Sequence, residues 1–290
     1  MNQFVIMTDS ASDLPQAVAE ELEVSVLPLR YNVQGQERLN WPDHREMDPR
    51  RFYDLLRKGE RATTVALNAH DYTEAMTPFL EEGRDILLLV FSSGLSTTYQ
   101  SCVMAVEELR EQYPDRKICA VDTLAASLGQ GLLVWHAARL RAQGKSMEEV
   151  RDWVEENKLH LCHWFTVDDL NHLKRGGRVS AATALVGTML SIKPVLHVDD
   201  EGHLINMAKA RGRAASLKAL VDKMAETAID PGSQTIFISH GDCEEEARKL
   251  ADMVRERFGV EVAVIGTIGP VIGAHSGPGT MALFFLGEKR

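Results

Sequence analysis

The sequence predicts an α/β protein with two domains: an N-terminal, mostly parallel, doubly wound sheet and a C-terminal mixed α+β domain. The chain has 290 residues, which is enough for one large domain or two ordinary ones. In its first half, short apolar runs alternate with amphipathic stretches, a pattern typical of buried parallel strands joined by helices. The second half contains a hairpin pattern, which favours a mixed sheet. We therefore expect an N-terminal domain over residues 1–160 and a C-terminal domain over residues 161–290.

The first half alternates expected strands with expected helices. The clearest strand is Ile86–Phe91, in which every residue is apolar. The expected strands are residues 4–7, 24–29, 86–91 and 118–121, and the expected helices are residues 14–22, 97–112 and 126–141. Residues 31–60 are more polar and irregular, so we predict a small insertion there with a short helix near residues 49–58.

The second half begins its regular structure with a β-hairpin. Two apolar runs flank Asp199-Asp-Glu-Gly202, and a turn that contains glycine is typical of a hairpin. The expected strands are residues 195–198, 203–208, 235–239 and 260–265, and the expected helices are residues 213–227 and 243–258. This order fits a mixed α+β domain better than a continued parallel sheet.

Composition and charge exclude several functional classes. The net charge of -10 argues against general nucleic-acid binding, which needs a basic surface, and permits at most transient membrane contact. The four cysteines form no Cys-x-x-Cys pair, and no His/Cys cluster has zinc-ligand spacing, so we expect no metal site. No basic segment followed by an apolar stretch opens the chain, and no apolar run is long enough to span a membrane. We expect a cytoplasmic protein.

The first candidate binding segment is Ser92–Thr98, between the clearest strand and its helix. Unpaired amides at a helix start carry a partial positive charge, and hydroxyls beside a flexible Gly94 complete a small anion site for carboxylate or phosphate. Ligands of open α/β sheets bind at this edge, outside the carboxyl ends of the strands. The alternative is ordinary capping of the helix by Ser93 or Ser96.

Two further segments combine polar side chains in the same way. Residues 8–14 (Thr-Asp-Ser-Ala-Ser-Asp-Leu) also follow a strand, and they line the same crevice or simply cap a helix. Residues 174–180 place Arg175 and Arg178 around a glycine pair. Arginine suits bidentate recognition of a carboxylate or phosphate, although a solvated basic turn is the plain alternative.

The fourth segment, residues 268–279, contains one histidine, His275, among several glycines and prolines. We expect a loop, because glycine permits positive φ angles and close approach of the backbone to a ligand. His275 is then a candidate acid, base or anion partner near neutral pH.

Familiar catalytic signatures are missing. The sequence has no P-loop, no GxGxxG after a strand, no GxSxG and no HExxH, so it does not support an autonomous nucleotide-using enzyme. A hydrolase could in principle combine Ser93 or Ser96 with His275 and either Asp9 or Asp122, although the strained nucleophile turn is absent.

The order of these segments resembles the DegV family of bacterial fatty-acid-binding proteins over nearly the whole chain. The resemblance rests on Thr8-Asp-Ser10 with Asp13-Leu14, Ser92-Ser-Gly-Leu-Ser96 with Tyr99-Gln-Ser101, Val121-Asp-Thr123 with Gly129-Gln-Gly-Leu-Leu-Val134, Leu173-Lys-Arg-Gly-Gly-Arg-Val-Ser180, Ile192-Lys-Pro-Val195 with residues 199–202, and Gly269-Pro-Val-Ile-Gly-Ala-His275 with Gly277-Pro-Gly279. Each motif is weak alone, and their shared order is specific.

The resemblance implies a function and a partner. Members of the family bury an acyl chain in the cleft between two domains and serve as the binding subunit of a fatty acid kinase. A separate kinase, similar to dihydroxyacetone kinases, uses ATP and Mg to phosphorylate the bound carboxylate, and the acyl phosphate feeds phospholipid synthesis. This chain would then bind a long-chain fatty acid and no cofactor of its own, and would itself be a non-catalytic subunit.

The same resemblance suggests residue roles. The carboxylate contacts fall on Thr64 and on Ser93 or Ser96 with Gly94, while His275 and one of Arg175 and Arg178 lie near the exposed head group. The acyl tunnel is expected to be lined by Leu95, Val186, Met189, Leu190, Ile192, Ile268, Val271 and Ile272.

Two positions depart from the family pattern. The pocket threonine is usually followed by Ser-Gln-Pro-Ser, whereas Thr64 is followed here by Val65-Ala-Leu-Asn68. A glycine usually follows the second loop serine, and Thr97 stands there instead. The less polar loop keeps a second hypothesis open, in which the chain is a lipid-binding or small-molecule-binding regulator without a kinase partner.

Overall fold

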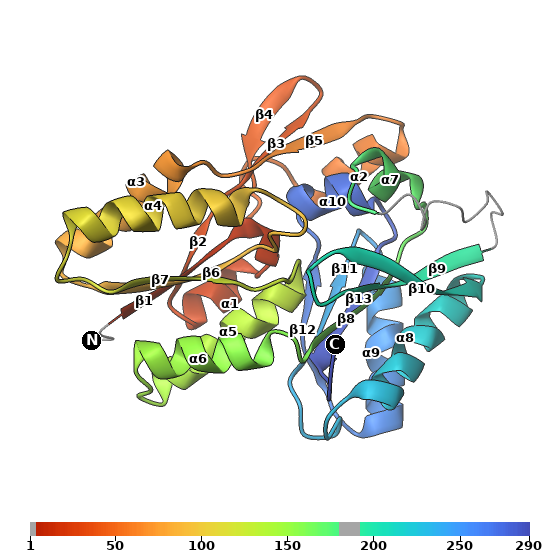
Figure 1. The fold of residues 1–290 in the computed structure, drawn as a ribbon. Helices are drawn as coiled ribbons and strands as arrows, with labels where there is room; N and C mark the ends of the chain where they lie inside the picture. Colours follow the sequence, from red (N-terminus) through yellow and green to blue (C-terminus); the bar gives the residue numbers. More distant parts are fainter. Residues whose placement is uncertain (1–3, 180–191) are drawn as a thin grey trace.

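Two sheets divide the structure, with a smaller third sheet above them (Figure 1). The computed structural model describes residues 4–179 and 192–290. The first sheet is parallel, with strand order β2-β1-β6-β7, and the second is mixed, with strand order β10-β9-β8-β13-β11-β12. The predicted fold class is confirmed: a parallel α/β sheet precedes a separate mixed sheet.

The elements of the first part run from β1 to α6. Their bounds are β1 Phe4–Asp9, α1 Gln16–Glu21, β2 Val24–Leu27, β3 Arg30–Val33, β4 Gln36–Leu39, α2 Pro49–Arg57, β5 Ala62–Val65, α3 Ala69–Glu81, β6 Asp85–Val90, α4 Thr98–Gln112, β7 Ile118–Asp122, α5 Leu128–Ala142 and α6 Met147–Asn157. Alternate residues of β1 face opposite layers: Val5 and Met7 pack against α3 and α4, whereas Phe4 and Ile6 pack against α5.

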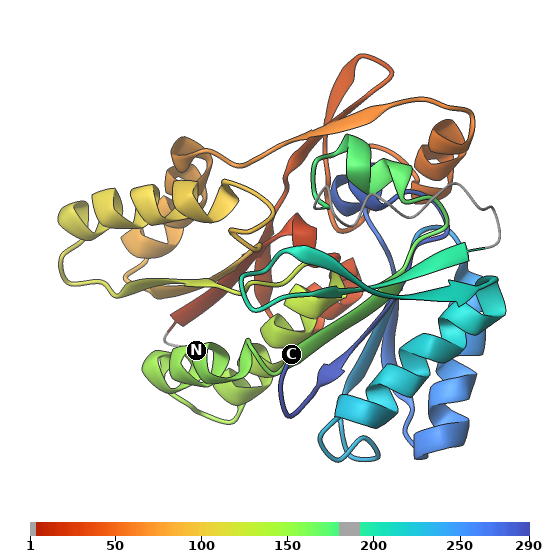
Figure 2. The ribbon, with the colours of Figure 1, turned by 45° about the vertical axis from the view of Figure 1, so that its right-hand side comes forward.

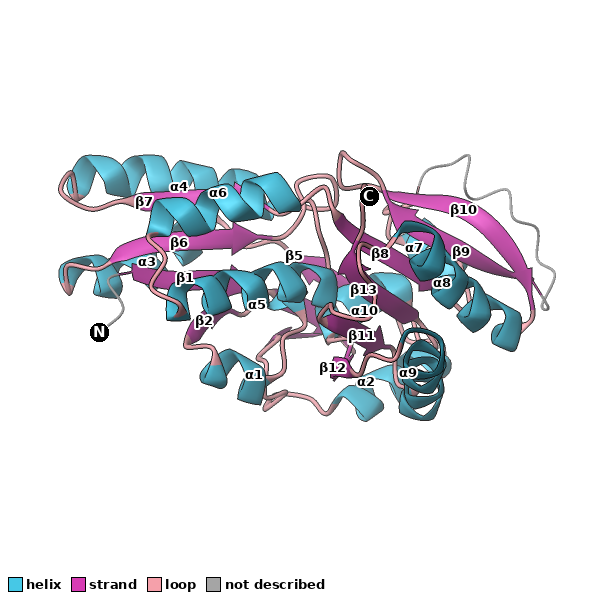
Figure 3. Cartoon of the chain, turned by 90° about the horizontal axis from the view of Figure 1, so that it is seen from below, coloured by secondary structure: helices cyan, strands magenta, loops and turns pink. Residues whose placement is uncertain are grey.

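The second part begins at β8 and ends at β13. Its elements are β8 Leu161–Thr166, α7 Asn171–Arg175, β9 Ile192–Val198, β10 Leu204–Arg211, α8 Arg213–Thr227, β11 Ile236–His240, α9 Glu244–Phe258, β12 Val262–Thr267, α10 Pro270–Ser276 and β13 Met281–Leu286. Helices α8 and α9 cover one face of this sheet (Figure 3). None of the helices in the described part of the chain is long and apolar enough to cross a membrane.

Helix α5 joins the two sheets through a shared core. Leu128, Leu132 and Leu133 pack in one cluster with Leu87 of the first sheet and Phe284 of the second. Ten of the fifteen residues of this helix are buried, as expected of a helix that packs on several sides. The change of sheet falls in the loop between α6 and β8, close to the boundary predicted at residue 160, but the division into domains stays a prediction.

The segment predicted to be an irregular insertion is better ordered than expected. Besides α2 it forms a three-stranded antiparallel sheet of order β4-β3-β5. Its hairpin turns at Gln34 and Gly35, both of which have positive φ angles, as two-residue hairpins require. Each of these strands has four residues, so the alternation of apolar and polar side chains is too short to be recognised among the charged residues of this segment.

The glycine-rich segment predicted to be a loop contains helix α10, so that prediction was wrong. Pro270 stands at the first helical position and Gly277, with φ of 79°, follows the last. Proline at the start and glycine after the end are ordinary helix boundaries. His275 therefore lies in a regular element.

Candidate functional site

A cavity of about 520 Å³ lies where the carboxyl ends of the first sheet's strands meet the face of the second sheet. Its surface is mainly apolar. Residues that follow β2, β6 and β7 form one side, strands β8, β11 and β13 with the β9–β10 hairpin form the floor, and β5 with α10 closes a third side. Figure 2 shows the arrangement of these elements. The lining residues are Leu29, Thr64, Val65, Ala66, Phe91, Ser93, Gly94, Leu95, Ser96, Thr97, Tyr99, Gln100, Ala126, Ser127, His163, Phe165, Leu173, Arg178, Val198, Leu204, Ser239, Ile268, Val271, Ile272, His275, Ser276, Thr280, Ala282 and Phe284.

His275 and Thr64 meet at the side of the cavity formed by α10 and β5. The Thr64 hydroxyl oxygen lies 2.8 Å from His275 Nε2, within hydrogen-bonding distance, although the two residues are 211 positions apart. Burial, and secondarily the positive charge of Arg178, lowers the pKa of His275 from 6.5 to about 4. The imidazole is therefore neutral at physiological pH, with one N–H donor and one acceptor.

Gly176 makes room for the His275 ring. A Cβ atom at residue 176 would lie 2.3 Å from His275 Nδ1, which is too close for any side chain to be tolerated there. The φ angle of Gly176 is -72°, which any residue can adopt, so the glycine is required by the contact and not by the backbone conformation. The absence of a side chain at residue 176 thus lets α7 pack directly against α10.

The structure separates the two candidate arginines. Arg178 lines the cavity, and its guanidinium donates hydrogen bonds to the carbonyl oxygens of Leu95 and Gly176. Arg175 is exposed, is not among the lining residues, and contacts His172 Nδ1 at 3.0 Å. Arg178 is therefore the arginine within reach of a ligand in this cavity.

The Ser92–Thr98 loop has already used most of its donors. Asp122 accepts a hydrogen bond from the Ser93 amide at 3.2 Å, and the amide of Thr98 donates to Ser96 Oγ at 3.2 Å. Ser96 Oγ also lies 2.8 Å from Thr98 Oγ1, so its hydroxyl is already engaged at the start of α4. The Ser93 hydroxyl lines the cavity and has no hydrogen-bond partner among the residues that the structure describes. What the loop offers a ligand is therefore the Ser93 hydroxyl, because most of its backbone amides are already hydrogen-bonded within the protein.

Close contact with the β9–β10 hairpin explains the glycine in this loop. A Cβ atom at Gly94 would lie 2.6 Å from the carbonyl oxygen of Glu201. The Ser92 hydroxyl donates to the carbonyl oxygen of Gly202 at 3.0 Å. The loop and the hairpin turn therefore form one continuous wall of the cavity.

Asp9 and Asp13 in residues 8–14 are fully engaged in buried hydrogen bonds. Asp9 accepts from the amides of Phe91 and Ala11, and Asp13 accepts from the Gly269 amide at 2.9 Å and from the Ser127 hydroxyl at 2.6 Å. Burial raises the pKa of Asp9 to about 6 and that of Asp13 to about 8. Neither carboxylate lines the cavity. Instead, their hydrogen bonds hold together the loops that line the cavity.

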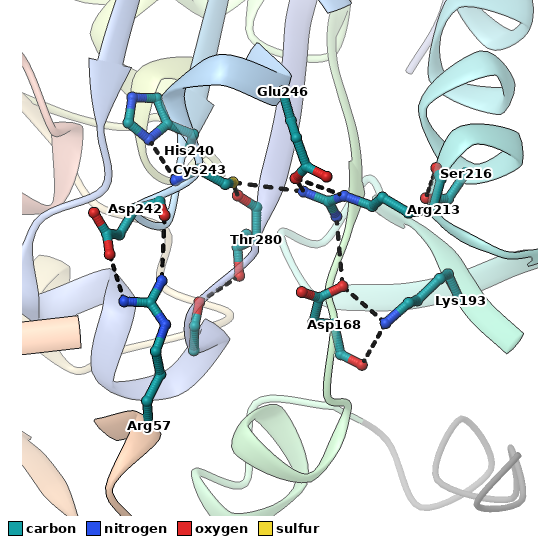
Figure 4. A network of polar contacts seen from close by, with 11 residues as sticks. Arg57, Asp168, Lys193, Arg213, Ser216, His240, Asp242, Cys243, Glu246 and Thr280 are labelled. Atoms are coloured by element: carbon teal, nitrogen blue, oxygen red, sulfur yellow. Dashed lines mark hydrogen bonds and ion pairs between the residues drawn. The ribbon is translucent and has the colours of Figure 1, made fainter. Parts of the chain in front are cut away.

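A polar network fixes the chain just after α10 (Figure 4). Asp168 lies between Lys193, at 2.8 Å, and Arg213, at 3.8 Å. A Cβ atom at Gly279 would fall 2.1 Å from Asp168 Oδ2, so the turn after α10 packs directly on this carboxylate. The Thr280 hydroxyl then donates to the carbonyls at the end of α10. The network holds α10, and with it His275, in place.

The arrangement contains no hydrolytic triad among the described residues. The oxygen atom near His275 Nε2 belongs to Thr64 and not to Ser93 or Ser96. The Asp122 carboxylate accepts from the amides of Ser93 and Leu124, and Nδ1 of His275 has no partner among the described residues. The geometry therefore lacks the carboxylate that would orient a catalytic histidine.

Comparison with known proteins assigns the family. Residues 3–288 match the family described as "Uncharacterised protein, DegV family". The chain belongs to the DegV family. A DegV domain-containing protein of Clostridium perfringens is 49% identical over 290 residues, covering 100% of this chain and 99% of that protein.

Solved structures of DegV proteins share this fold. A protein from Thermus thermophilus, whose structure is described as showing fatty acid binding of a DegV family protein, is 31% identical with a TM-score of 0.87, covering 98% of this chain and 99% of that one. A Thermotoga maritima protein, described as revealing fatty acid binding function, is 28% identical with a TM-score of 0.85, covering 99% of this chain and 100% of that one.

The apolar residues expected of a DegV tunnel divide into three groups. Leu95, Ile268, Val271 and Ile272 line the cavity. Ile192 does not, because it pairs with Arg211 at the end of the hairpin opposite to Val198 and Leu204, which do line it. Val186, Met189 and Leu190 lie outside the described residues.

Several lining residues were not among the sequence candidates. They lie on the floor and on the first turn of α4: Tyr99, Gln100, His163, Phe165, Ser239 and Phe284. Tyr99 and Gln100 stand in the DegV motif that follows the serine loop and could have been found from it. The strand residues could not, because alternation predicts a buried face without showing whether helix or cavity covers it.

Proposed function

We propose that this chain binds one long-chain fatty acid with the carboxylate beside Thr64, Ser93 and His275, and presents it to a partner kinase. The observation that carries the proposal is a mainly apolar cavity of about 520 Å³ with a polar group made by Thr64, His275, Ser93 and Arg178. The fatty acids bound by DegV relatives support the choice of ligand.

Energetics favour this class of ligand. Each buried methylene contributes roughly 0.8 kcal/mol, so a long acyl chain alone supplies tight binding. A carboxylate brought into the same cavity must find donors, because an unpaired buried charge is costly. Thr64 and Ser93 supply hydroxyl donors, and Arg178 supplies positive charge nearby.

The neutral state of His275 suggests how the carboxylate is held. With the proton on Nε2, the imidazole donates to the Thr64 oxygen, which frees the Thr64 hydroxyl proton for the carboxylate. The pKa of about 4 means that this arrangement does not depend on pH above about 5. A bound carboxylate would raise that pKa, since negative charge favours the imidazolium.

Presentation to a kinase needs an accessible carboxylate and compensating positive charge. A carboxylate oxygen would attack the γ-phosphorus of ATP held with Mg by the partner, the bond to the bridging oxygen would break, and ADP would leave. Arg178 would offset the charge that gathers on the transferred group. The exposed Arg175 would contact the kinase or its nucleotide.

The test is ATP-dependent acyl phosphate formation with a dihydroxyacetone-kinase-like partner. We expect product with the native chain, at least tenfold less with Arg178→Ala or His275→Ala, and retained lipid binding in both variants. Lys249→Ala, on the far helix α9, is the matched control and should leave the rate unchanged. Absence of product with every fatty acid and partner tested would refute presentation even if lipid is bound.

A regulator without a kinase partner is the second candidate. The observation that favours it is the apolar edge after Thr64, where Val65 lines the cavity and is 40% exposed. A less polar rim is better suited to a protein that recognises whether the cavity holds a ligand than to a kinase that transfers phosphate to it. Fatty-acid-dependent capture of a protein other than a kinase, with no acyl phosphate formed, would favour this function.

A further inference from the structure

The floor of the cavity contains a histidine whose ring nitrogens have no hydrogen-bond partner in the part of the chain that the structure describes. His163, on β8, is only 2% exposed and lines the cavity. Neither its Nδ1 nor its Nε2 has a hydrogen-bond partner among the described residues. Burial holds its pKa well below 6.5, so the ring is neutral and carries one donor and one acceptor. Buried polar groups are nearly always paired, so this one calls for an explanation.

Packing prevents His163 from turning toward another partner. A Cβ atom at Gly129 would lie 2.3 Å from Nε2, so the ring edge rests directly on the first turn of α5. Phe284 meets the ring edge to face at a centroid distance of 5.6 Å. The ring is thus held between the first turn of α5 and Phe284, and neither contact supplies a hydrogen-bond partner for its nitrogens.

A second unpaired group belongs to the same cavity. Ser276, the last residue of α10, is 5% exposed, and its hydroxyl has no partner among the described residues. The other floor hydroxyls differ, because Ser127 and Ser239 lie 3.0 Å apart and Ser127 also donates to Asp13. Among the described residues, the cavity therefore keeps polar atoms free at His163 and Ser276, as it does at Nδ1 of His275, while it satisfies the hydroxyls of Ser127 and Ser239.

We infer that the preferred ligand is a long-chain hydroxy fatty acid, whose chain hydroxyl pairs with His163 or Ser276. This inference rests on the proposed function and names the class of fatty acid. A hydroxyl both donates and accepts, which matches a neutral imidazole and a serine hydroxyl. A site built to bind a ligand hydroxyl discriminates strongly against the analogue that lacks it, because its own polar groups are then left unpaired.

The test compares stearic acid with monohydroxystearic acids that carry the hydroxyl at successive positions, using the delipidated full chain and calorimetry. We expect at least one positional isomer to bind about tenfold or more tightly than stearic acid. Binding of stearic acid as tightly as every isomer would overturn the inference while leaving the proposed function intact. Failure of all these acids to bind would instead refute the proposed function.

Variants identify the residue that pairs with the hydroxyl. His163→Phe should abolish the preference at the favoured position and leave stearic acid binding unchanged or tighter, and Ser276→Ala supplies the same test if His163→Phe does not fold. His136→Phe is the matched control, because His136 packs against Trp135 and Trp153 outside the cavity. A preference retained in both cavity variants would contradict the assignment.

Discussion

Two polar clusters at the carboxyl edge of the first sheet differ in how completely their groups are satisfied. Asp9 and Asp13 are buried, and their oxygens accept four hydrogen bonds from protein groups. His275 lies near the other end of α10, the helix whose N-cap, Gly269, donates to Asp13. One of its ring nitrogens lies near Thr64, and the other has no partner among the described residues. Both clusters stood out in the sequence for the same reason, a group of polar residues after a strand or among glycines.

The difference separates groups that build the site from groups that face the ligand. The Asp9 and Asp13 carboxyl groups hold loops together and lie outside the cavity wall, whereas His275 and Ser93 line the cavity and keep unused hydrogen-bonding capacity. Ser96 also lines the cavity, but its hydroxyl is already engaged by Thr98. Residual hydrogen-bonding capacity, and not residue type, therefore distinguishes the two roles.

The largest effect is expected from removing a carboxylate of the satisfied cluster. Asp9→Ala leaves the amides of Phe91 and Ala11 buried without acceptors, which should lower the free energy of unfolding by about 2–4 kcal/mol. Urea denaturation measures the change. Asp9→Asn retains one acceptor oxygen, enough for one of the two amides, and should cost less than Asp9→Ala, so equal losses in the two variants would contradict this role.

The next effect concerns Gly176, which packs against the His275 ring. Gly176→Ala should displace the His275 ring and lower acyl phosphate formation with the partner kinase by about tenfold, because the new methyl group would lie 2.3 Å from Nδ1. Gly177→Ala is the matched control: it is strained at φ of 68°, but no atom lies within 4 Å of the added carbon. Equal losses of rate in the two variants would show that backbone strain, and not His275, is responsible.

A pH effect distinguishes Asp13 from the histidines. Its folded pKa of about 8 exceeds the unfolded value of 3.8, so the folded state binds more protons between them and stability falls as pH rises through that window. Between about pH 6.5 and pH 8 the slope should reach roughly 1 kcal/mol per pH unit, above the range in which the buried histidines titrate. Asp13→Asn should flatten the slope in urea denaturation, and an unchanged slope would exclude Asp13 as its source.

The smallest effect is expected at the ligand-facing cluster itself. Thr64→Val keeps the shape of the side chain and removes one hydroxyl, so stability should change by less than about 1 kcal/mol while fatty acid affinity falls by about tenfold. Thr63→Val next to it is the control, since Thr63 does not line the cavity. An affinity loss in the control as large as that in Thr64→Val would remove the hydroxyl from the account.

The sequence predicted the layout of the fold better than the details of the site. Apolar runs such as Ile86–Phe91 and the helix over residues 213–227 are local signals, and the structure agrees with them closely. The helix around His275 was missed because it is short and flanked by glycines, although Pro270 and Gly277 mark its boundaries. The three-stranded sheet of the insertion was missed because its strands are short and carry charges.

The choice between alternatives within the site depended on contacts between distant segments. Whether Arg175 or Arg178 reaches the cavity follows from the packing of α7 on α10, which no local pattern encodes. The partnership of His275 with Thr64 joins residues 211 positions apart and came only from family resemblance. His163 was not recognised, since a single histidine in a buried strand gives no sign that a cavity covers it.

The central claim is that the cavity takes one fatty acid with its carboxylate at the Thr64–His275 side. Native mass spectrometry of the purified chain, followed by identification of the released ligand after denaturation, tests it most directly. The account predicts a single long-chain fatty acid per chain, with occupancy reduced in Thr64→Val. A chain that retains no acyl ligand and binds none when fatty acid is added would contradict it.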